Sequence, residues 1–115
     1  MEILKCTSTD KKVRYLLTMS SSNKKMNEAV GMTLKIKEYA IYTDEAIDKD
    51  TGEMKSRKLV SIMDEDGSIY TAMSATFIKT FESILEVFGD ELPDIEVISA
   101  RSNRGRQYID CTIVI

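Results

Sequence analysis

Hydrophobic and polar residues alternate along several stretches of the chain, and such alternation is typical of half-buried β-strands. Residues 32–43 form the longest of these stretches. Residues 59–63 and 68–73 are shorter and are separated by an acidic turn that ends in glycine, and residues 95–101 and 107–115 form a final pair. The pattern predicts five strands, with hairpins joining the second to the third and the fourth to the fifth.

One stretch has helical spacing instead. Ser74 is the predicted N-cap of this helix, and Gly89 and Pro93 end it. Five apolar residues lie on a single stripe of the helix: Phe77, Phe81, Ile84, Leu85 and Phe88. Because this is the spacing of core residues, we expect the phenylalanines to plug the bottom of a barrel rather than to stack on a ligand.

The first strand changes phase along its length. Leu34 and Ile36 share one phase, whereas Tyr39 and Ile41 take the other. A bulge or strong bend would return both pairs to the inward face, as expected for a first strand that curves around a small barrel. An unbroken strand, with Ala40 in register with Ile36, is the alternative.

The leading part of the chain gives two signals. Residues 13–17 alternate like a strand, whereas residues 24–30 have the pattern of a short helical turn, with Asn27 or Ser22 as its cap and Gly31 at its end. The first 20 residues stay open between an extra strand, a helix and a disordered arm.

Residues 44–58 are polar and charged and centre on Gly52, so we predict a long mobile hairpin loop between the first two strands. The loop contains Asp48, Asp50 and Glu53. The glycine falls fifth from Asp48, where an EF-hand loop needs it sixth, and no glutamate stands at the twelfth place. No metal site is predicted.

The order strand-strand-strand-helix-strand-strand is that of an OB-type barrel. We therefore predict a mainly β protein with one helix, as a five-stranded OB-type barrel with the helix between strands 3 and 4. Residues 1–115 are expected to form a single domain, in which residues 1–30 are an N-terminal extension of undecided structure. Barrels of this type often hold single-stranded nucleic acid or oligosaccharide.

Composition argues against catalysis. The chain has no His, and Cys6 and Cys111 lie far apart without a CxxC motif, so we expect two free thiols, no metal and no cofactor. The motifs of serine hydrolases, P-loop proteins, zinc proteases and dinucleotide-binding enzymes are absent. A metal-dependent nuclease would need clustered carboxylates that the sequence does not place. With neither a long apolar run nor a secretory signal, we expect a soluble, cytoplasmic, non-enzymatic protein.

The net charge is −3, but the charged residues are unevenly distributed along the chain. Residues 1–30 carry six Lys/Arg and three Asp/Glu, residues 31–100 carry seven and fifteen, and residues 101–115 carry three and one. Positive charge is therefore at the two ends of the chain, which a closed barrel would bring together.

The strongest candidate site is near the C-terminus. Arg101, Arg104 and Arg106 surround a glycine turn, and Tyr108 projects outward from the strand that follows. Guanidinium groups bind phosphates, and an exposed aromatic ring is a platform for any base. The alternative is a solvated hairpin tip.

A second candidate lies on the first strand. If no bulge intervened, Lys35, Lys37 and Tyr39 would form a basic and aromatic stripe on an outward face. The stripe fits a nucleic-acid backbone, and it also fits an ordinary solvated sheet face. A continuous basic groove from the lysines to Tyr108 would favour the first interpretation.

A resemblance to a known family runs from about Lys24 to the C-terminus and rests on five segments: Gly31–Leu34, Ile69–Ala72, Ser74–Ile78, Phe88–Gly89 and Ser102–Cys111. These segments resemble small single-stranded DNA-binding proteins encoded by phages and mobile elements of Gram-positive bacteria. It implies an OB-type fold and a role in coating single-stranded DNA during replication or recombination of a phage or integrated element. It also places Arg104, Arg106 and Tyr108 at the binding face.

The leading prediction is therefore sequence-independent binding of single-stranded DNA. Unlike better-known bacterial proteins of this kind, the chain ends in Ile113–Ile115 without an acidic tail, so recruitment of partners by such a tail is not expected. The alternative function is an OB-like protein-interaction module of a phage or integrated element, with residues 44–58 as its contact surface. Replication or recombination proteins and a second copy of the chain are further partners that the prediction allows; a membrane is not.

Overall fold

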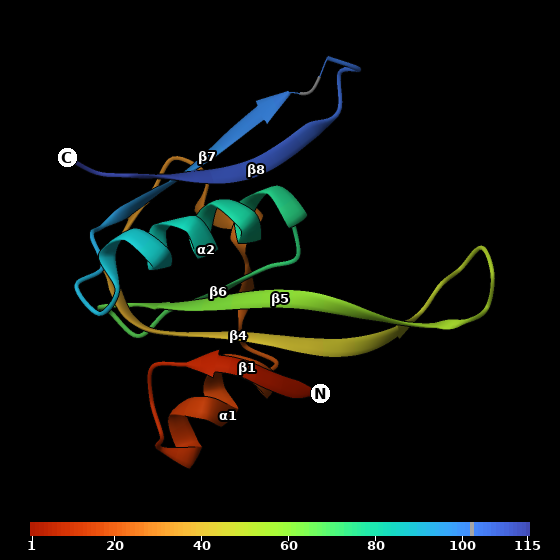
Figure 1. Ribbon diagram of the computed structural model, residues 1–115, viewed down its shortest axis with the longest axis horizontal. Helices are drawn as coiled ribbons and strands as arrows, with labels where there is room; N and C mark the ends of the chain where they lie inside the picture. Colours follow the sequence, from red (N-terminus) through yellow and green to blue (C-terminus); the bar gives the residue numbers. More distant parts are fainter. Residues whose placement is uncertain (102) are drawn as a thin grey trace.

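A computed structural model describes residues 1–101 and 103–115, which contain two β-sheets, two α-helices and one 3-10 helix (Figure 1). The larger sheet has the order β1-β4-β5-β6-β2 and the smaller one the order β3-β7-β8. The strands are β1 (Glu2–Cys6), β2 (Lys24–Lys25), β3 (Thr33–Leu34), β4 (Ile36–Ile47), β5 (Met54–Asp64), β6 (Ile69–Ala72), β7 (Ile95–Arg101) and β8 (Gln107–Ile113). The helices are α1 (Lys11–Met19), η1 (Met26–Ala29) and α2 (Ala75–Phe88).

The predicted bulge in the first strand is confirmed. The β4–β5 ladder shifts register between Ile36 and Glu38, and β3, just before this point, pairs with β7 in the other sheet. The continuous segment of β3 and β4 therefore pairs with strands of both sheets. The shift places Tyr39 in the main core with Leu34, whereas Ala40 faces the opposite side, so the unbroken strand is wrong.

Helix α2 forms as predicted and fills the space between the two sheets. The Ser74 hydroxyl caps it by accepting a hydrogen bond from the Phe77 amide, and Gly89, with a φ of 60°, ends it. Phe77 and Phe81 are fully buried, and the Tyr39 ring meets Phe81 edge-on with 5.4 Å between ring centroids. The apolar stripe therefore belongs to the core.

A second α-helix corrects the expectation of one. The Asp10 carboxylate caps α1 through the amides of Lys12 and Val13. Val13 and Leu17, which looked like alternate strand positions, are also one helical turn apart, and both face a second apolar cluster on the side of the large sheet opposite α2. Of the helices in the described ranges, none is long and apolar enough to cross a membrane.

The expected mobile loop at 44–58 is also corrected. Strand β4 continues to Ile47 and β5 begins at Met54, so most of this region is a two-stranded ribbon that extends beyond the rest of the sheet (Figure 1). Arg57 holds Asp44 across the ribbon through two hydrogen bonds of 2.6 and 3.1 Å. Cross-strand ion pairs of this kind stabilise strands that lack an apolar face.

The two sheets do not close into the predicted barrel. In residues 1–101 and 103–115 no ladder joins β6 to β8. Strand β2 instead pairs in parallel with β6, through Lys24 opposite Tyr70, and so occupies the edge that β8 would need. The turn predicted after β2 is η1; its N-cap is Lys25 rather than Asn27 or Ser22, and it leads to Gly31 at a φ of 88°.

Candidate nucleic-acid interface

The predicted arginine cluster lies on the β7–β8 hairpin. Arg101 ends β7 opposite Gln107, Arg104 is in the turn, Arg106 precedes β8, and all three arginines are exposed. The predicted turn began at Ser102, which lies outside the described residues. Among the residues that are described, no carboxylate forms an ion pair with Arg101 or Arg104, so both guanidinium groups keep their charge available to an anion.

Tyr108 lies on the outer face of β8, as predicted. It stands opposite Ala100 and is half-buried, whereas Ile109 and Cys111 alternate with it and point into the core. Burial is the main cause that raises the pKa of the Cys111 thiol to about 12, and the nearby Asp110 carboxylate adds to the effect. Cys111 is thus a neutral core residue.

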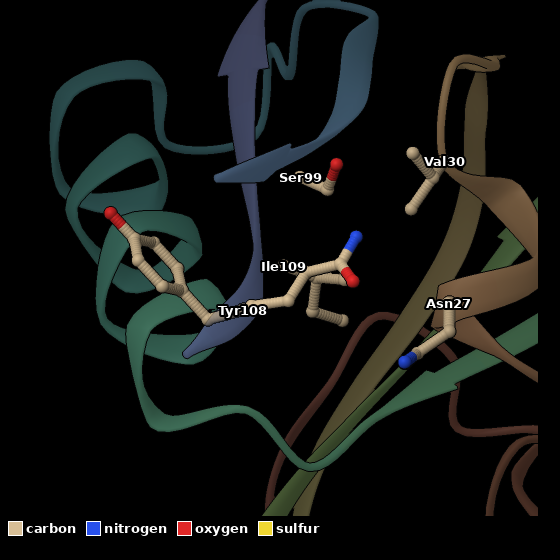
Figure 2. Close-up of a pocket in the computed structure, with 6 residues that line it drawn as sticks. Asn27, Val30, Ser99, Tyr108 and Ile109 are labelled. Carbon is tan, nitrogen blue, oxygen red and sulfur yellow. The ribbon is translucent and has the colours of Figure 1, made fainter. Parts of the chain in front are cut away.

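A groove of about 280 Å³ separates the hairpin from η1, at the place where the barrel stays open. Asn27 and Val30 line one wall, and Ser99, Gln107 and Ile109 line the other. In Figure 2 the Tyr108 ring points away from Asn27 and Val30, so Tyr108 borders the groove without filling it. The lining residues carry no charge.

Basic residues flank this groove on both sides. The β7–β8 hairpin, which carries Arg101, Arg104 and Arg106 and is called the arginine hairpin below, continues one wall of the groove. Lys24 and Lys25, directly before η1, adjoin the other wall. The Lys24 ammonium lies 5.6 Å from the centre of the Tyr70 ring, a cation–π contact that holds the side chain over the sheet. The sequence showed both lysines as part of the positive charge of residues 1–30, but it did not indicate where in the fold they lie.

The outward stripe predicted on the first strand does not form. The bulge turns Tyr39 into the core, where 4% of its surface is exposed, and leaves Lys35 and Lys37 in solvent. The Lys35 ammonium lies 3.9 Å from a Glu65 carboxylate oxygen. Tyr39 therefore presents no surface for a base to stack on.

The structure also separates these lysines from the arginine hairpin. Thr33 pairs with Glu96, and Arg101 is five residues farther along β7, which is roughly 16 Å at about 3.3 Å per residue. A continuous basic groove from Lys35 and Lys37 to Tyr108, which would have favoured a nucleic-acid site on the first strand, therefore does not form in the described part of the chain. The candidate site in this structure instead combines the arginine-bearing β7–β8 hairpin with the β2–η1 segment.

The comparisons with known proteins agree with this chemistry. A family model described as phage single-stranded DNA-binding protein matches residues 2–114. No curated protein and no solved structure matches the chain. Because the family match spans nearly the whole chain, the protein belongs to the phage single-stranded DNA-binding protein family.

Proposed function

We propose that this chain coats single-stranded DNA, without reading its sequence, during replication or recombination of a phage or integrated phage element. The bound strand lies against the β7–β8 hairpin and the groove beside it. Arg101 and Arg104 bind phosphates, and Tyr108 supplies an aromatic surface at the rim. Such binding acts in the cytoplasm and needs no cofactor.

One observation carries the proposal: two exposed guanidinium groups, neither of them in an ion pair with a described residue, adjoin an uncharged groove on a member of a DNA-binding family. Phosphate contacts give affinity without sequence preference. The uncharged lining of the groove, with Asn27, Ser99 and Gln107, supplies hydrogen-bonding groups that any base edge can use.

The strand connections support an OB-related interface. Strands β4, β5 and β6, then α2, then β7 and β8 follow the order of an OB barrel that lacks one ladder. OB folds bind oligonucleotides partly through the loop between their last two strands. In this chain that loop is the arginine hairpin. We take the whole chain as one domain built on this plan.

Fluorescence anisotropy tests the proposal, with labelled oligo-dT of about 30 nucleotides and duplex DNA of the same length at low and moderate salt. We expect binding to the single strand that weakens with salt, and much weaker binding to the duplex. The absence of binding to oligo-dT at low salt would contradict the proposal.

A second candidate function is protein binding through the β4–β5 ribbon. Ile47 and Met54 stand opposite each other near its tip and expose 67% and 60% of their surfaces. An apolar pair displayed on a charged ribbon is suited to a partner protein. This candidate gains weight only if oligo-dT fails to bind.

A further inference from the structure

A second cleft, of about 400 Å³, lies between α1 and the edge strand β1. Ile3 of β1 lines one side, and Lys11, Arg14, Tyr15 and Met19 of α1 line the other. Lys11, Tyr15 and Met19 follow one another at intervals of four residues, so they form a single stripe along the helix. The cleft has no part in the site described above.

Tyr15 is the most informative residue of this cleft. It exposes 56% of its surface, whereas Tyr39, Tyr42 and Tyr70 expose 4% each. No other aromatic residue in the described part of the chain is as open to solvent. Leu17 anchors α1 to the sheet from another side of the helix, so the fold does not need the Tyr15 ring at the surface.

The charges around the ring favour an anion. Lys11 and Arg14 line the cleft, and no carboxylate lines it within the ranges described. Neither cation takes part in an ion pair with another described residue. An aromatic face between a lysine and an arginine fits a base together with its adjoining phosphates.

The position of α1 strengthens this assignment. OB folds bind oligonucleotides on the outer face of their second and third strands, which here are β5 and β6. Helix α1 lies on that face: its Leu17 belongs to the same buried apolar cluster as Leu59, Met63 and Ile69. A strand that crosses this side of the molecule therefore meets α1 instead of the sheet.

We propose that the cleft between α1 and β1 is a second contact for the same DNA strand, in which Tyr15 stacks on one base while Lys11 and Arg14 bind the neighbouring phosphates. This inference rests on the proposed function. It assigns to the N-terminal segment a binding surface that is separate from the arginine hairpin.

Tyrosine fluorescence provides a direct test, because the chain has five tyrosines and no tryptophan. Oligo-dT of about 30 nucleotides should quench the emission of the wild-type protein, and Tyr15→Leu should remove the part of that quenching that Tyr15 contributes and raise Kd about 5- to 150-fold. Tyr15→Phe keeps an aromatic face and should restore a near wild-type Kd in the anisotropy assay. Tyr108→Leu should remove the quenching that arises at the rim of the groove and retain the quenching that comes from Tyr15, so the two variants distinguish the two contacts.

The phosphate contacts have their own test. Lys11→Ala with Arg14→Ala should flatten the dependence of log K on log salt by about 1.4, at roughly 0.7 per lost phosphate contact. Lys49→Ala with Lys79→Ala removes the same charge from exposed positions elsewhere and should leave the slope near that of the wild type.

The outcomes separate this inference from the proposed function. If oligo-dT binds and the arginine-hairpin variants weaken it, but Tyr15→Leu changes neither the quenching nor Kd, the second contact is overturned and the function stands. If Tyr15→Phe binds as weakly as Tyr15→Leu, stacking is overturned. If the wild-type protein binds no oligo-dT at low salt, both proposals fail.

Discussion

Removal of Arg101 and Arg104 from the β7–β8 hairpin should change how strongly the binding of oligo-dT depends on salt. Arg101 and Arg104 are exposed and form no ion pair with a described residue, so their replacement breaks no carboxylate contact in the described structure. Arg101→Ala with Arg104→Ala is therefore a perturbation of ligand binding with little expected effect on folding.

The size of the effect follows from counterion release. Each lost phosphate contact lowers the slope of log K against log salt by about 0.7 for a single strand, so two contacts amount to about 1.4. Between 50 and 200 mM salt, the wild-type affinity should therefore fall roughly 7-fold more than that of the double variant. Anisotropy titrations with oligo-dT at three salt concentrations in this range measure the slope directly.

The control variant distinguishes local contacts from net charge. Lys49→Ala with Lys79→Ala also removes two exposed positive charges, one from the end of the ribbon and one from α2. If the arginines contact phosphates, only the arginine double variant flattens the slope. Equal slopes for the two double variants would refute the reasoning, because the effect would then come from overall charge.

Four further predictions concern folding and the thiols. Phe81→Ala should lower the free energy of unfolding by about 3–5 kcal/mol in urea denaturation, because its ring is fully buried. Gly31→Ala should lower it by about 1–2 kcal/mol, since Gly31 holds a φ of 88° while its amide donates to the Val97 carbonyl. In native protein, Ellman's reagent should label the half-buried Cys6 and leave Cys111 unreacted until the chain unfolds. Because burial raises the pKa of Cys111 from 9.0 to about 12, its contribution to stability is complete below pH 9 and should be lost as the pH rises toward 12; Cys111→Ala should weaken this loss.

Local signals explain which elements the sequence predicts correctly. Ser74 caps α2 with its own side chain, and Gly67, with a φ of 89°, closes the turn between β5 and β6. The bulge near Glu38 follows from a change of phase within one strand. Each of these features depends on residues close together in the chain, so no tertiary information is needed.

The elements that the sequence left open or predicted wrongly depend on contacts between distant residues, or on segments too short to show a clear period. Val13 and Leu17 fit both a strand and a helix, and only Asp10, as an N-cap, favours the helix. Hydrophobic and polar residues do not alternate in the β4–β5 ribbon, because ion pairs such as Arg57 with Asp44 stabilise it in place of an apolar face. Barrel closure depends on which strand reaches the edge of β6, and no local pattern reveals that β2 does.

The residues of the candidate site were likewise predictable only where they lie close together in the chain. The three arginines lie within six residues of sequence, so their clustering on one hairpin was predictable. The predicted stripe of Lys35, Lys37 and Tyr39 does not form, because a single bulge moves every later residue of the strand to the opposite face of the sheet. Lys24 joins the groove only through the pairing of β2 with β6, and Tyr15 joins its cleft only through the packing of α1 beside β1.

The groove and the covered sheet face have a common structural cause. After α1, the Asn23 side-chain amide donates to the Leu16 carbonyl at 2.7 Å and turns the chain toward β2, which takes the free edge of β6. Gly31 then donates to the Val97 carbonyl at 2.8 Å and ties the segment to the other sheet. The same N-terminal segment thus covers the outer face of β5 and β6, occupies the edge that would close the barrel, and forms one wall of the groove left there. Because this segment also carries Lys11, Arg14 and Tyr15, both of the proposed contacts for DNA depend on how it packs against the two sheets.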